Sequence, residues 1–266
     1  MKTDFHIHSS FSSDSKSPMS DMVAHGVMLG LETICFTEHL DYNFPDGNLA
    51  FDLDIGAYYR EYRRLCEQYH NQIEILFGIE LGLQPHLGQR YADLLASWPF
   101  DFVIGSSHVV DGMDPYYPSF FEGRDESACY QKYFESIVEN VKAYSGMDVY
   151  GHIDYIVRYG PNKDKHYSYS KYKEVLDEAL RLIVAKGIGL ELNTSGYKYG
   201  LEYPNPHPDI LRRYRELGGE IITLGSDGHR PEHIAYDFYK VKNILKDCGF
   251  RYYTVFRQRK PEFVKI

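Results

Sequence analysis

Seven short apolar runs recur along the chain, and polar or amphipathic stretches separate them. Each run holds four to eight residues and is rich in β-branched or aromatic side chains, which is typical of buried strands. The runs cover Thr3–His8, Thr33–Thr37, Glu74–Leu81, Phe100–Ser107, Asp148–Asp154, Ile188–Thr194 and Glu220–Ser226. This series predicts seven βα units and a parallel sheet, either closed into a barrel or wound open.

Between these runs, apolar residues recur with the spacing of amphipathic helices, and two such stripes cover 56–70 and 175–183. Two helices are expected to start at a serine cap and to end at a glycine, from Ser20 to Gly30 and from Ser170 to Gly187. Pro208 and Pro231 fall where the first turn of a helix accepts proline. Residues 250–266 are expected to add a last strand, whose place in the order stays open.

Each of the seven runs ends at or near a histidine, an acidic residue or an amide. These residues are His6, His8, His39, Glu80, His108, His152, Glu191, Asn193, Asp227 and His229. In a parallel α/β barrel the carboxyl ends of the strands converge on one mouth, whereas in an open sheet they form a line. Because such a set can share one centre only in a barrel, the sequence favours the barrel.

The same polar residues indicate a metal site. His6 and His8 are two apart, so on a strand they share one face, and Asp227 and His229 repeat this spacing if their strand runs that far. A single histidine of this kind usually satisfies hydrogen bonds in a core, but six at strand ends make that explanation weak. Imidazole and carboxylate ligands without thiolates suit Mn²⁺, Fe²⁺ or Zn²⁺. We therefore predict a multinuclear metal site.

Composition excludes several classes of protein. The 266 residues carry a net charge of −9, which argues against a general nucleic-acid surface. No apolar run is long enough to span a membrane. Four scattered cysteines without a paired motif indicate a reducing compartment, so a cytoplasmic protein is expected. Because the chain shows no repeat or linker, we expect residues 1–266 to form a single domain. The sequence does not indicate the oligomeric state.

Six motifs resemble those of the polymerase and histidinol phosphatase (PHP) family, in the family's order. They are Asp4-Phe5-His6-Ile7-His8, Phe36-Thr37-Glu38-His39, Gly78-Ile79-Glu80, Ser106-Ser107-His108, Gly151-His152-Ile153-Asp154 and Gly225-Ser226-Asp227-Gly228-His229. The resemblance implies a distorted (β/α)7 TIM-like barrel that holds up to three metal ions at its carboxyl mouth. The segments around His108 and His152 look most like those of stand-alone histidinol-phosphate phosphatases.

The resemblance also implies which residues hold each ion. One ion would take His6, His8, Glu80 and Asp227, and a second would share Glu80 and add His108 and His152. A third would take Asp14, His39 and His229. Many family members have a histidine where this chain has Asp14. A carboxylate is a harder ligand, which shifts the expectation for that ion toward Mn²⁺ or Fe²⁺.

The implied function is that of a metal-dependent phosphomonoesterase, which hydrolyses L-histidinol phosphate in histidine biosynthesis through attack by a metal-bridging hydroxide. Asp227, His229 and Asp154 are the candidate catalytic residues, and the proton for the leaving oxygen would come from a metal-bound water, Asp154 or His229, a choice that stays open. Arg158, Arg230 and Lys198 are candidate phosphate contacts. Glu191 and Asn193 would orient the metal ligands. Candidate partners of a cationic substrate group are Glu38, Asp41 and Asp111.

Counting charges favours a phosphate monoester as substrate. Three divalent ions, three carboxylates and a hydroxide leave two positive charges, which a phosphomonoester dianion neutralises. Two ions with the same ligands would leave a neutral site. Three alternatives stay open: a phosphodiesterase or exonuclease on the same centre, a phosphatase of another small monoester, and a non-catalytic metal-binding module. The nuclease would need a basic track for a strand, which the net charge disfavours.

Overall fold

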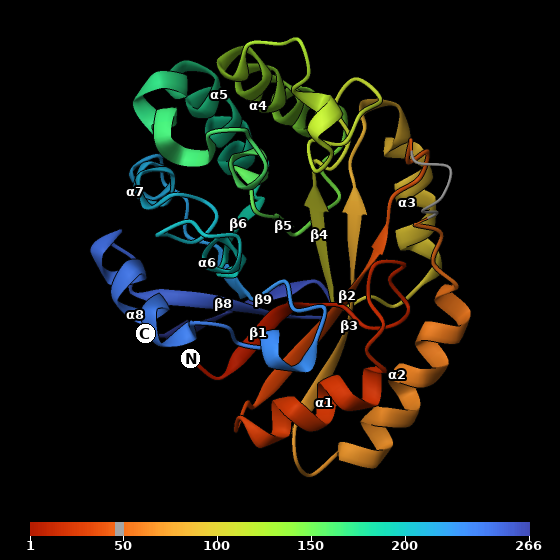
Figure 1. Ribbon diagram of the computed structural model, residues 1–266. Coiled ribbons are helices and arrows are strands. Elements are labelled where there is room, and N and C mark those ends of the chain that lie inside the picture. The colour runs from red at the N-terminus through yellow and green to blue at the C-terminus, as the bar shows by residue number, and fades with distance from the viewer. Residues whose placement is uncertain (46–50) are drawn as a thin grey trace.

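Seven parallel strands form the centre of the computed structural model, which describes residues 1–45 and 51–266 (Figure 1). They are β1 (Thr3–Ile7), β2 (Thr33–Leu40), β3 (Glu74–Gly82), β4 (Phe102–Ser106), β5 (Val149–Tyr150), β6 (Gly189–Asn193) and β7 (Ile222–Gly225). Each strand pairs in parallel with the next one in the sequence. All seven carboxyl ends therefore point toward the same end of the sheet, as the alternating pattern predicts.

Helices surround the strands (Figure 1). The α-helices are α1 (Met19–Met28), α2 (Ile55–Tyr69), α3 (Gly88–Ser97), α4 (Glu126–Ala143), α5 (Lys173–Ala185), α6 (Ser195–Lys198), α7 (Pro208–Glu216) and α8 (Phe238–Asp247). Short 3-10 helices cover Pro85–Leu87, Pro118–Phe120, Tyr155–Arg158, Lys163–His166, Tyr169–Tyr172 and Pro231–His233. In the described part of the chain, no helix combines the length and the apolar character that crossing a membrane requires.

The sheet closes on itself between β1 and the segment that follows β7. The backbone N–H of His8 donates to the carbonyl of Gly228 over 2.9 Å, and the N–H of Gly228 donates to the carbonyl of His6 over 3.3 Å. These bonds place residues 6–8 directly beside residues 227–229. The prediction of a barrel rather than an open sheet is confirmed.

A hairpin at the carboxyl terminus covers the opposite end of the barrel. It consists of β8 (Tyr252–Arg257) and β9 (Lys260–Lys265), which pair antiparallel in a sheet of their own. Arg257 binds Glu74 at the start of β3, with a Nε–Oε1 distance of 2.7 Å, and Arg259 binds Asp148 just before β5. The expected last strand is therefore a separate hairpin and not an eighth member of the barrel.

The helix starts differ from the predicted ones, whereas the helix ends agree. Ser20 lies inside α1, and Ser170 lies in the 3-10 turn before α5, so neither serine caps an α-helix. Gly30 and Gly187 both adopt a positive φ directly after their helices, which is the conformation that glycine accepts best. Pro208 opens α7 as expected.

Two strand predictions need correction, and the helix at Pro231 is short. Pro231 opens only a short 3-10 turn. The strand predicted over Asp148–Asp154 contains only Val149 and Tyr150. The N–H of His152 donates to the side chain of Glu191 over 2.9 Å, so it is not available for a backbone hydrogen bond to a neighbouring strand. Similarly, β7 ends at Gly225, and Asp227 has a φ of 54°, so Asp227 and His229 do not share a strand face.

Phe256 anchors the hairpin to the barrel, which generates a prediction about stability. Its ring is 2% exposed and lies 5.2 Å from the ring of Phe102 on β4. Truncation of a buried phenylalanine removes apolar contacts and leaves a void, so Phe256→Ala should lower the free energy of unfolding by about 3–5 kcal/mol. Urea unfolding checks this value.

The matched control is Phe263→Ala, since Phe263 lies on the same hairpin but is 50% exposed. It should change the free energy of unfolding by less than about 1 kcal/mol. Equal effects of the two substitutions would show that the hairpin does not contribute to the stability of the barrel.

Candidate metal centre

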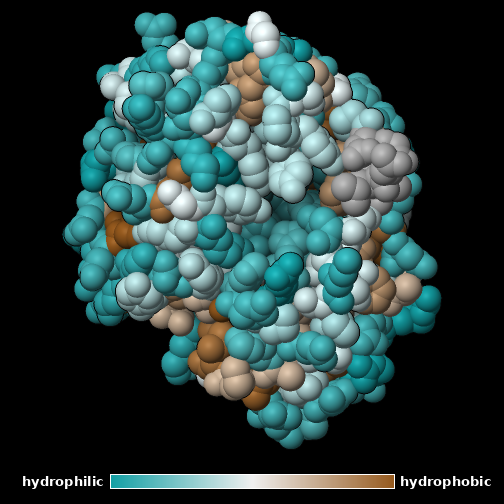
Figure 2. Space-filling view, viewed as in Figure 1, coloured by the Kyte–Doolittle hydropathy of each residue, from teal (hydrophilic) through white to brown (hydrophobic). Residues whose placement is uncertain are grey.

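A cavity of about 540 Å³ opens at the carboxyl ends of the strands. Figure 2 shows the molecule from the side of Figure 1, with a hollow of hydrophilic residues near the middle of this face. The cavity is lined, among others, by His39, His108, His152, Asp227 and His229. The strand-end residues thus lie together at one mouth, as the barrel predicts.

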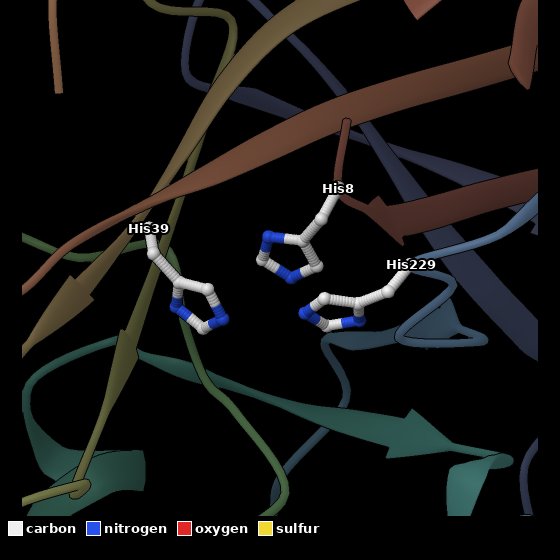
Figure 3. A group of neighbouring side chains, drawn as sticks. All are labelled: His8, His39 and His229. Atoms are coloured by element: carbon white, nitrogen blue, oxygen red, sulfur yellow. The ribbon is translucent and has the colours of Figure 1, made fainter. Parts of the chain in front are cut away.

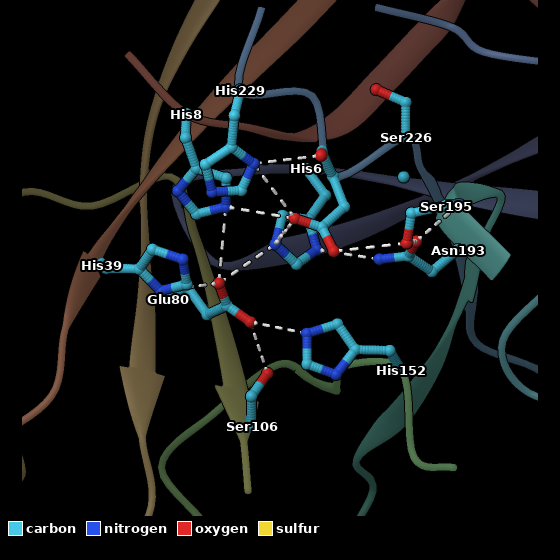
Figure 4. Close-up of polar contacts among 12 residues, drawn as sticks. His6, His8, His39, Glu80, Ser106, His152, Asn193, Ser195, Ser226 and His229 are labelled. Atoms are coloured by element: carbon cyan, nitrogen blue, oxygen red, sulfur yellow. Dashed lines mark hydrogen bonds and ion pairs between the residues drawn. The ribbon is translucent and has the colours of Figure 1, made fainter. Parts of the chain in front are cut away.

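The carboxylate of Glu80 on β3 occupies the centre of the cluster and is fully buried (Figure 4). Its Oε2 faces three imidazole nitrogens, at 3.1 Å from His6, 3.4 Å from His8 and 3.1 Å from His39. Its Oε1 faces the Nε2 atoms of His152 at 3.0 Å and His108 at 3.4 Å. Each carboxylate oxygen therefore belongs to a different set of histidines.

A second group of rings stands at the outer side of the cluster (Figure 3). The ring of His8 is nearly parallel to those of His39 and His229, with its centroid 4.2 Å from each, and the centroids of His39 and His229 lie 5.7 Å apart. Asp14 approaches the same group, with its Oδ2 at 3.0 Å from the Nε2 of His229 and 3.6 Å from that of His39. The three residues predicted to hold the third ion are therefore neighbours.

Oxygen atoms behind the cluster fix the orientation of three histidine rings. The Nδ1 of His6 lies 2.6 Å from Glu191, that of His108 lies 2.7 Å from Asp41, and that of His8 lies 3.1 Å from the hydroxyl of Ser12. When each Nδ1–H donates to its oxygen, the Nε2 lone pair points toward the centre. This is the arrangement of histidines that bind metals.

Several ring nitrogens in the cluster have no hydrogen bond within the described chain. They include the Nε2 of His8, the Nδ1 of His39 and the Nε2 of His229. Each nevertheless lies 3.0–3.4 Å from a carboxylate oxygen. That separation is close to the distance between adjacent ligands that are each about 2.1 Å from one metal ion. The donor set therefore fits divalent metal ions.

Triplets of these side chains also meet the spacing of a metal site, since their ligand atoms lie within 4.8 Å of one another. The triplets are His6–His8–Glu80, His6–His152–Asp227, Glu80–His108–His152, His8–His39–His229 and His39–Asp41–His108. All nine residues predicted as ligands lie in or beside this cluster. The triplets overlap, which is typical of ions that share ligands.

Positive neighbours keep the central carboxylates ionised. Burial alone would raise the pKa of Glu80, but the nearby imidazoles of His6 and His39 outweigh it and hold that pKa well below the ordinary range. Burial likewise opposes ionisation of Asp227, and His6 and Arg158 overcome it, so that its pKa is also well below the usual value. Both carboxylates are therefore ready to bind cations at neutral pH.

The backbone turn that presents Asp227 is held from several sides. Its left-handed φ of 54° is unfavourable for a side chain other than glycine. Lys198 donates to the carbonyls of Ser226 and Asp227, both over 2.8 Å, and the N–H of Ser226 donates to Asp4 over 3.0 Å. At Gly225, a Cβ atom would lie 2.5 Å from the Cβ of His6, so only glycine fits there.

Arg158, predicted as a phosphate contact, is buried at the wall of the cavity. It donates to the Oδ2 of Asp227 over 3.0 Å, to Asn205 over 2.7 Å and to Asn193 over 3.3 Å. These bonds use three of its five N–H groups. Lys198 and Arg230 also line the cavity, and Arg230 is exposed.

Other predicted residues lie away from the cavity surface. The carboxylate of Asp154 accepts bonds from Asn205 over 2.6 Å and from the N–H of His207 over 2.8 Å, and it is not part of the cavity lining. Its location argues against its expected role as a proton donor. Glu38, expected to contact a cationic substrate, is buried beneath the cluster, where its carboxylate accepts bonds from Ser9 and Ser12.

The two remaining candidate partners of a cation have other neighbours. Asp41 lines the cavity but is bound to His108. Asp111 is 62% exposed and lies 3.7 Å from Lys132. Sequence reasoning did not identify Asn205, which links Asp154 to Arg158. No local motif marks Asn205, because it reaches the site through a backbone pairing with Asn193 that only the folded chain creates.

Comparison with known proteins gives a consistent result. A model of the PHP domain matches residues 4–195. The chain is 32% identical over 256 residues to the histidinol-phosphatase of Lactococcus lactis subsp. lactis (strain IL1403), covering 96% of this chain and 94% of that protein. It is 31% identical to a probable histidinol-phosphatase of Clostridium acetobutylicum, covering 94% of this chain and 95% of that one.

Solved structures are similar over the same length. The crystal structure of histidinol phosphate phosphatase from Lactococcus lactis, complexed with zinc, L-histidinol and phosphate, has a TM-score of 0.91 and 31% sequence identity, covering 98% of each chain. A putative histidinol phosphatase from Listeria monocytogenes has a TM-score of 0.79 and 19% identity, covering 90% of this chain and 99% of that one. The latter similarity concerns the fold alone.

The bond between His6 and Glu191 predicts an effect on metal affinity. The negative charge of Glu191 orients the ring of His6 and raises its basicity. Glu191→Gln removes this charge. We expect the affinity for Zn²⁺ or Mn²⁺ to fall by about 10- to 100-fold, as for other residues behind metal ligands. Isothermal titration of the metal-free protein measures this change.

The control is Glu220→Gln, because Glu220 is an exposed glutamate. Equal affinities of the two variants would contradict the role of Glu191.

Proposed function

The chain belongs to the PHP domain family, and on that premise we propose that it hydrolyses L-histidinol phosphate to L-histidinol and phosphate. It is a metal-dependent phosphoric monoester hydrolase. The observation that carries this proposal is the convergence of five histidines on the two oxygens of Glu80. Identity of 31% over almost the whole length to a structure that holds zinc, L-histidinol and phosphate supports the choice of substrate.

We propose that the cluster holds three divalent ions, with Mn²⁺, Fe²⁺ and Zn²⁺ as the suitable metals. His6, His8, Glu80 and Asp227 would hold the first ion. Glu80, His108 and His152 would hold the second, and Asp14, His39 and His229 the third. This assignment is supported by the division of the Glu80 oxygens between two sets of rings and by the approach of Asp14 to the third set.

The number of ions follows from the charge of the site. Glu80, Asp14 and Asp227 together contribute three negative charges, and a phosphomonoester brings two more. With a bound hydroxide as well, three divalent ions bring the sum to zero, whereas two would leave two negative charges unbalanced in a buried cluster. When bound, the ions would activate water and neutralise charge on the phosphate.

The protein's own side chains orient the substrate and determine where the proton of the attacking water goes. Arg158 is fixed by three hydrogen bonds and keeps two N–H groups for a phosphate oxygen at the cavity wall. The Oδ1 of Asp227 faces the histidine cluster, while its Oδ2 is occupied by Arg158. Because this Oδ1 would hold the first ion, it is not free to accept the proton of the attacking water, and we propose that water in the open cavity takes up that proton.

Neither of the two side chains predicted as proton donors, Asp154 and His229, suits the leaving oxygen. Asp154 is not part of the cavity lining. His229 lines it, but its Nδ1 contacts the carbonyl of Asp227 at 3.1 Å and its Nε2 faces Asp14. Because the Nε2 of His229 would hold the third ion and its Nδ1 contacts a carbonyl, we propose that water in the open cavity protonates the leaving oxygen.

The biological setting is part of the same proposal. Residues 1–266 would act as a single catalytic domain, in agreement with the near-complete coverage of the relatives. A histidinol-phosphate phosphatase would act in histidine biosynthesis in the cytoplasm. The absence of paired cysteine motifs in the sequence agrees with a reducing compartment.

The direct test is phosphate release from L-histidinol phosphate, measured with added Mn²⁺ and with a chelator. A phosphodiester and several other monoesters are assayed beside it. We expect turnover of L-histidinol phosphate that the chelator abolishes, with little release from the phosphodiester. Release from other monoesters alone would overturn the substrate, and preferred cleavage of the diester would favour a nuclease. A metal-bound protein without any turnover would be a binding module.

The location of Arg158 predicts a change in substrate binding. Arg158→Ala should raise KM for L-histidinol phosphate by about 10- to 100-fold, because a charged hydrogen bond to phosphate is lost. Arg212→Ala is the matched control, since Arg212 is an exposed arginine on α7 that pairs with Asp209. Steady-state kinetics give both values. An unaltered KM in Arg158→Ala would remove this residue from the phosphate site.

A further inference from the structure

The cavity has an acidic side chain that neither the metal cluster nor the phosphate contacts use. Asp114 lies on the loop after β4, lines the cavity and is only 8% exposed. One of its oxygens accepts the N–H of Tyr116 over 2.8 Å. Among the described residues, no lysine or arginine forms an ion pair with Asp114, unlike Asp227, which pairs with Arg158.

The surroundings of Asp114 disfavour an uncompensated negative charge. Burial raises the pKa of its carboxyl group to about 6, against smaller opposing effects of the Tyr116 N–H and His108. A buried carboxylate is costly unless a cation or several donors compensate it. A positively charged group that entered the cavity would provide this compensation.

Aromatic rings connect Asp114 with the phosphate-binding arginine. The side chain of Tyr155 is close enough to Asp114 to lower the pKa of its carboxyl group slightly, and the guanidinium carbon of Arg158 lies 5.5 Å from the ring centroid of Tyr155. Tyr159 lies 4.8 Å from Tyr155 and 5.2 Å from the ring of Tyr116, which is 53% exposed. Tyrosine faces attract cations, so this wall suits a cationic ligand as well as an apolar one.

The other acidic residues near the cavity are less suitable for this role. Asp41 lines the cavity, but its Oδ2 is bound to the Nδ1 of His108, so it acts on a metal ligand. Asp111, three residues before Asp114, is exposed and near Lys132. Asp114 is therefore the carboxylate that can serve a ligand without disturbing the cluster.

We propose that Asp114 and the neighbouring tyrosines form a cation subsite that selects phosphate esters carrying a protonated nitrogen. This inference rests on the proposed function and deepens it. The phosphate binds beside Arg158 on the Asp227 side of the cavity, and the cationic part of the ester extends toward Asp114 on the His108 side. The subsite thus recognises the alcohol portion of the substrate, whereas the metal cluster recognises its phosphate.

The test compares two substrates in one variant. Asp114→Asn keeps the size of the side chain and its bond to the Tyr116 N–H but removes its charge. We expect kcat/KM for L-histidinol phosphate to fall by about 10- to 100-fold, mainly through KM. For p-nitrophenyl phosphate, which has no cationic nitrogen, kcat/KM should change by less than about twofold. Phosphoethanolamine, a small cationic ester, should lose activity as L-histidinol phosphate does.

The control variant is Asp111→Asn, which removes an exposed carboxylate from the same loop and should behave as the unmodified protein with all three esters. Equal losses for cationic and neutral esters in Asp114→Asn would overturn the subsite and assign Asp114 a role in the loop structure. Unchanged kinetics with L-histidinol phosphate would also overturn it. Failure of the proposed function is distinguishable, because the unmodified protein would then hydrolyse p-nitrophenyl phosphate without hydrolysing L-histidinol phosphate.

Discussion

The burial of Glu80 is the constraint on which the site depends. A carboxylate removed from water is unstable unless positive charge surrounds it, and the described side chains around Glu80 that supply it are imidazoles. Imidazoles can be neutral at pH 7, so they stabilise the carboxylate incompletely without a further cation. Divalent ions would complete this arrangement, and the proposed ion positions depend on the division of the Glu80 oxygens between two sets of histidines.

Several structural features maintain the geometry around this carboxylate. Glu191, Asp41 and Ser12 orient three rings from behind. Lys198 and Asp4 hold the turn that carries Asp227 in an unfavourable backbone conformation. These contacts come from elements far apart in the sequence, so the stability of the barrel and the geometry of the cluster cannot be separated. The protein uses buried polar bonds chiefly to place ligands.

The sequence predicted much of the fold from local periodicity, and it predicted the cluster from polar residues at strand ends together with the resemblance to PHP motifs. Apolar runs of strand length, each with polar residues at its carboxyl end, are sufficient to indicate a barrel mouth. The ends of β5 and β7 were not predictable, because side chains from neighbouring strands end them. Glu191 takes the N–H of His152, and the turn at Asp227 depends on Lys198.

The same limit applies to the predicted contacts of the substrate. Glu38, Asp41 and Asp111 are acidic residues near motifs, but the charge of a residue does not reveal whether its partner is a ligand or another side chain. Asp154 follows the His152 motif directly, yet its contacts with Asn205 and His207 turn it away from the cavity. Asp114 carries no motif, and only its burial at the cavity wall distinguishes it.

The closure of the barrel through Gly228 also orders events during synthesis of the chain. His6 and His8 leave the ribosome first, whereas Asp227 and His229 follow more than two hundred residues later. Until the segment after β7 is made and pairs with β1, the early histidines lack Asp227 and His229 as neighbours. A nascent or truncated chain would therefore lack two of the proposed ligands, and the proposed metal ions would be acquired in full only after the barrel closes.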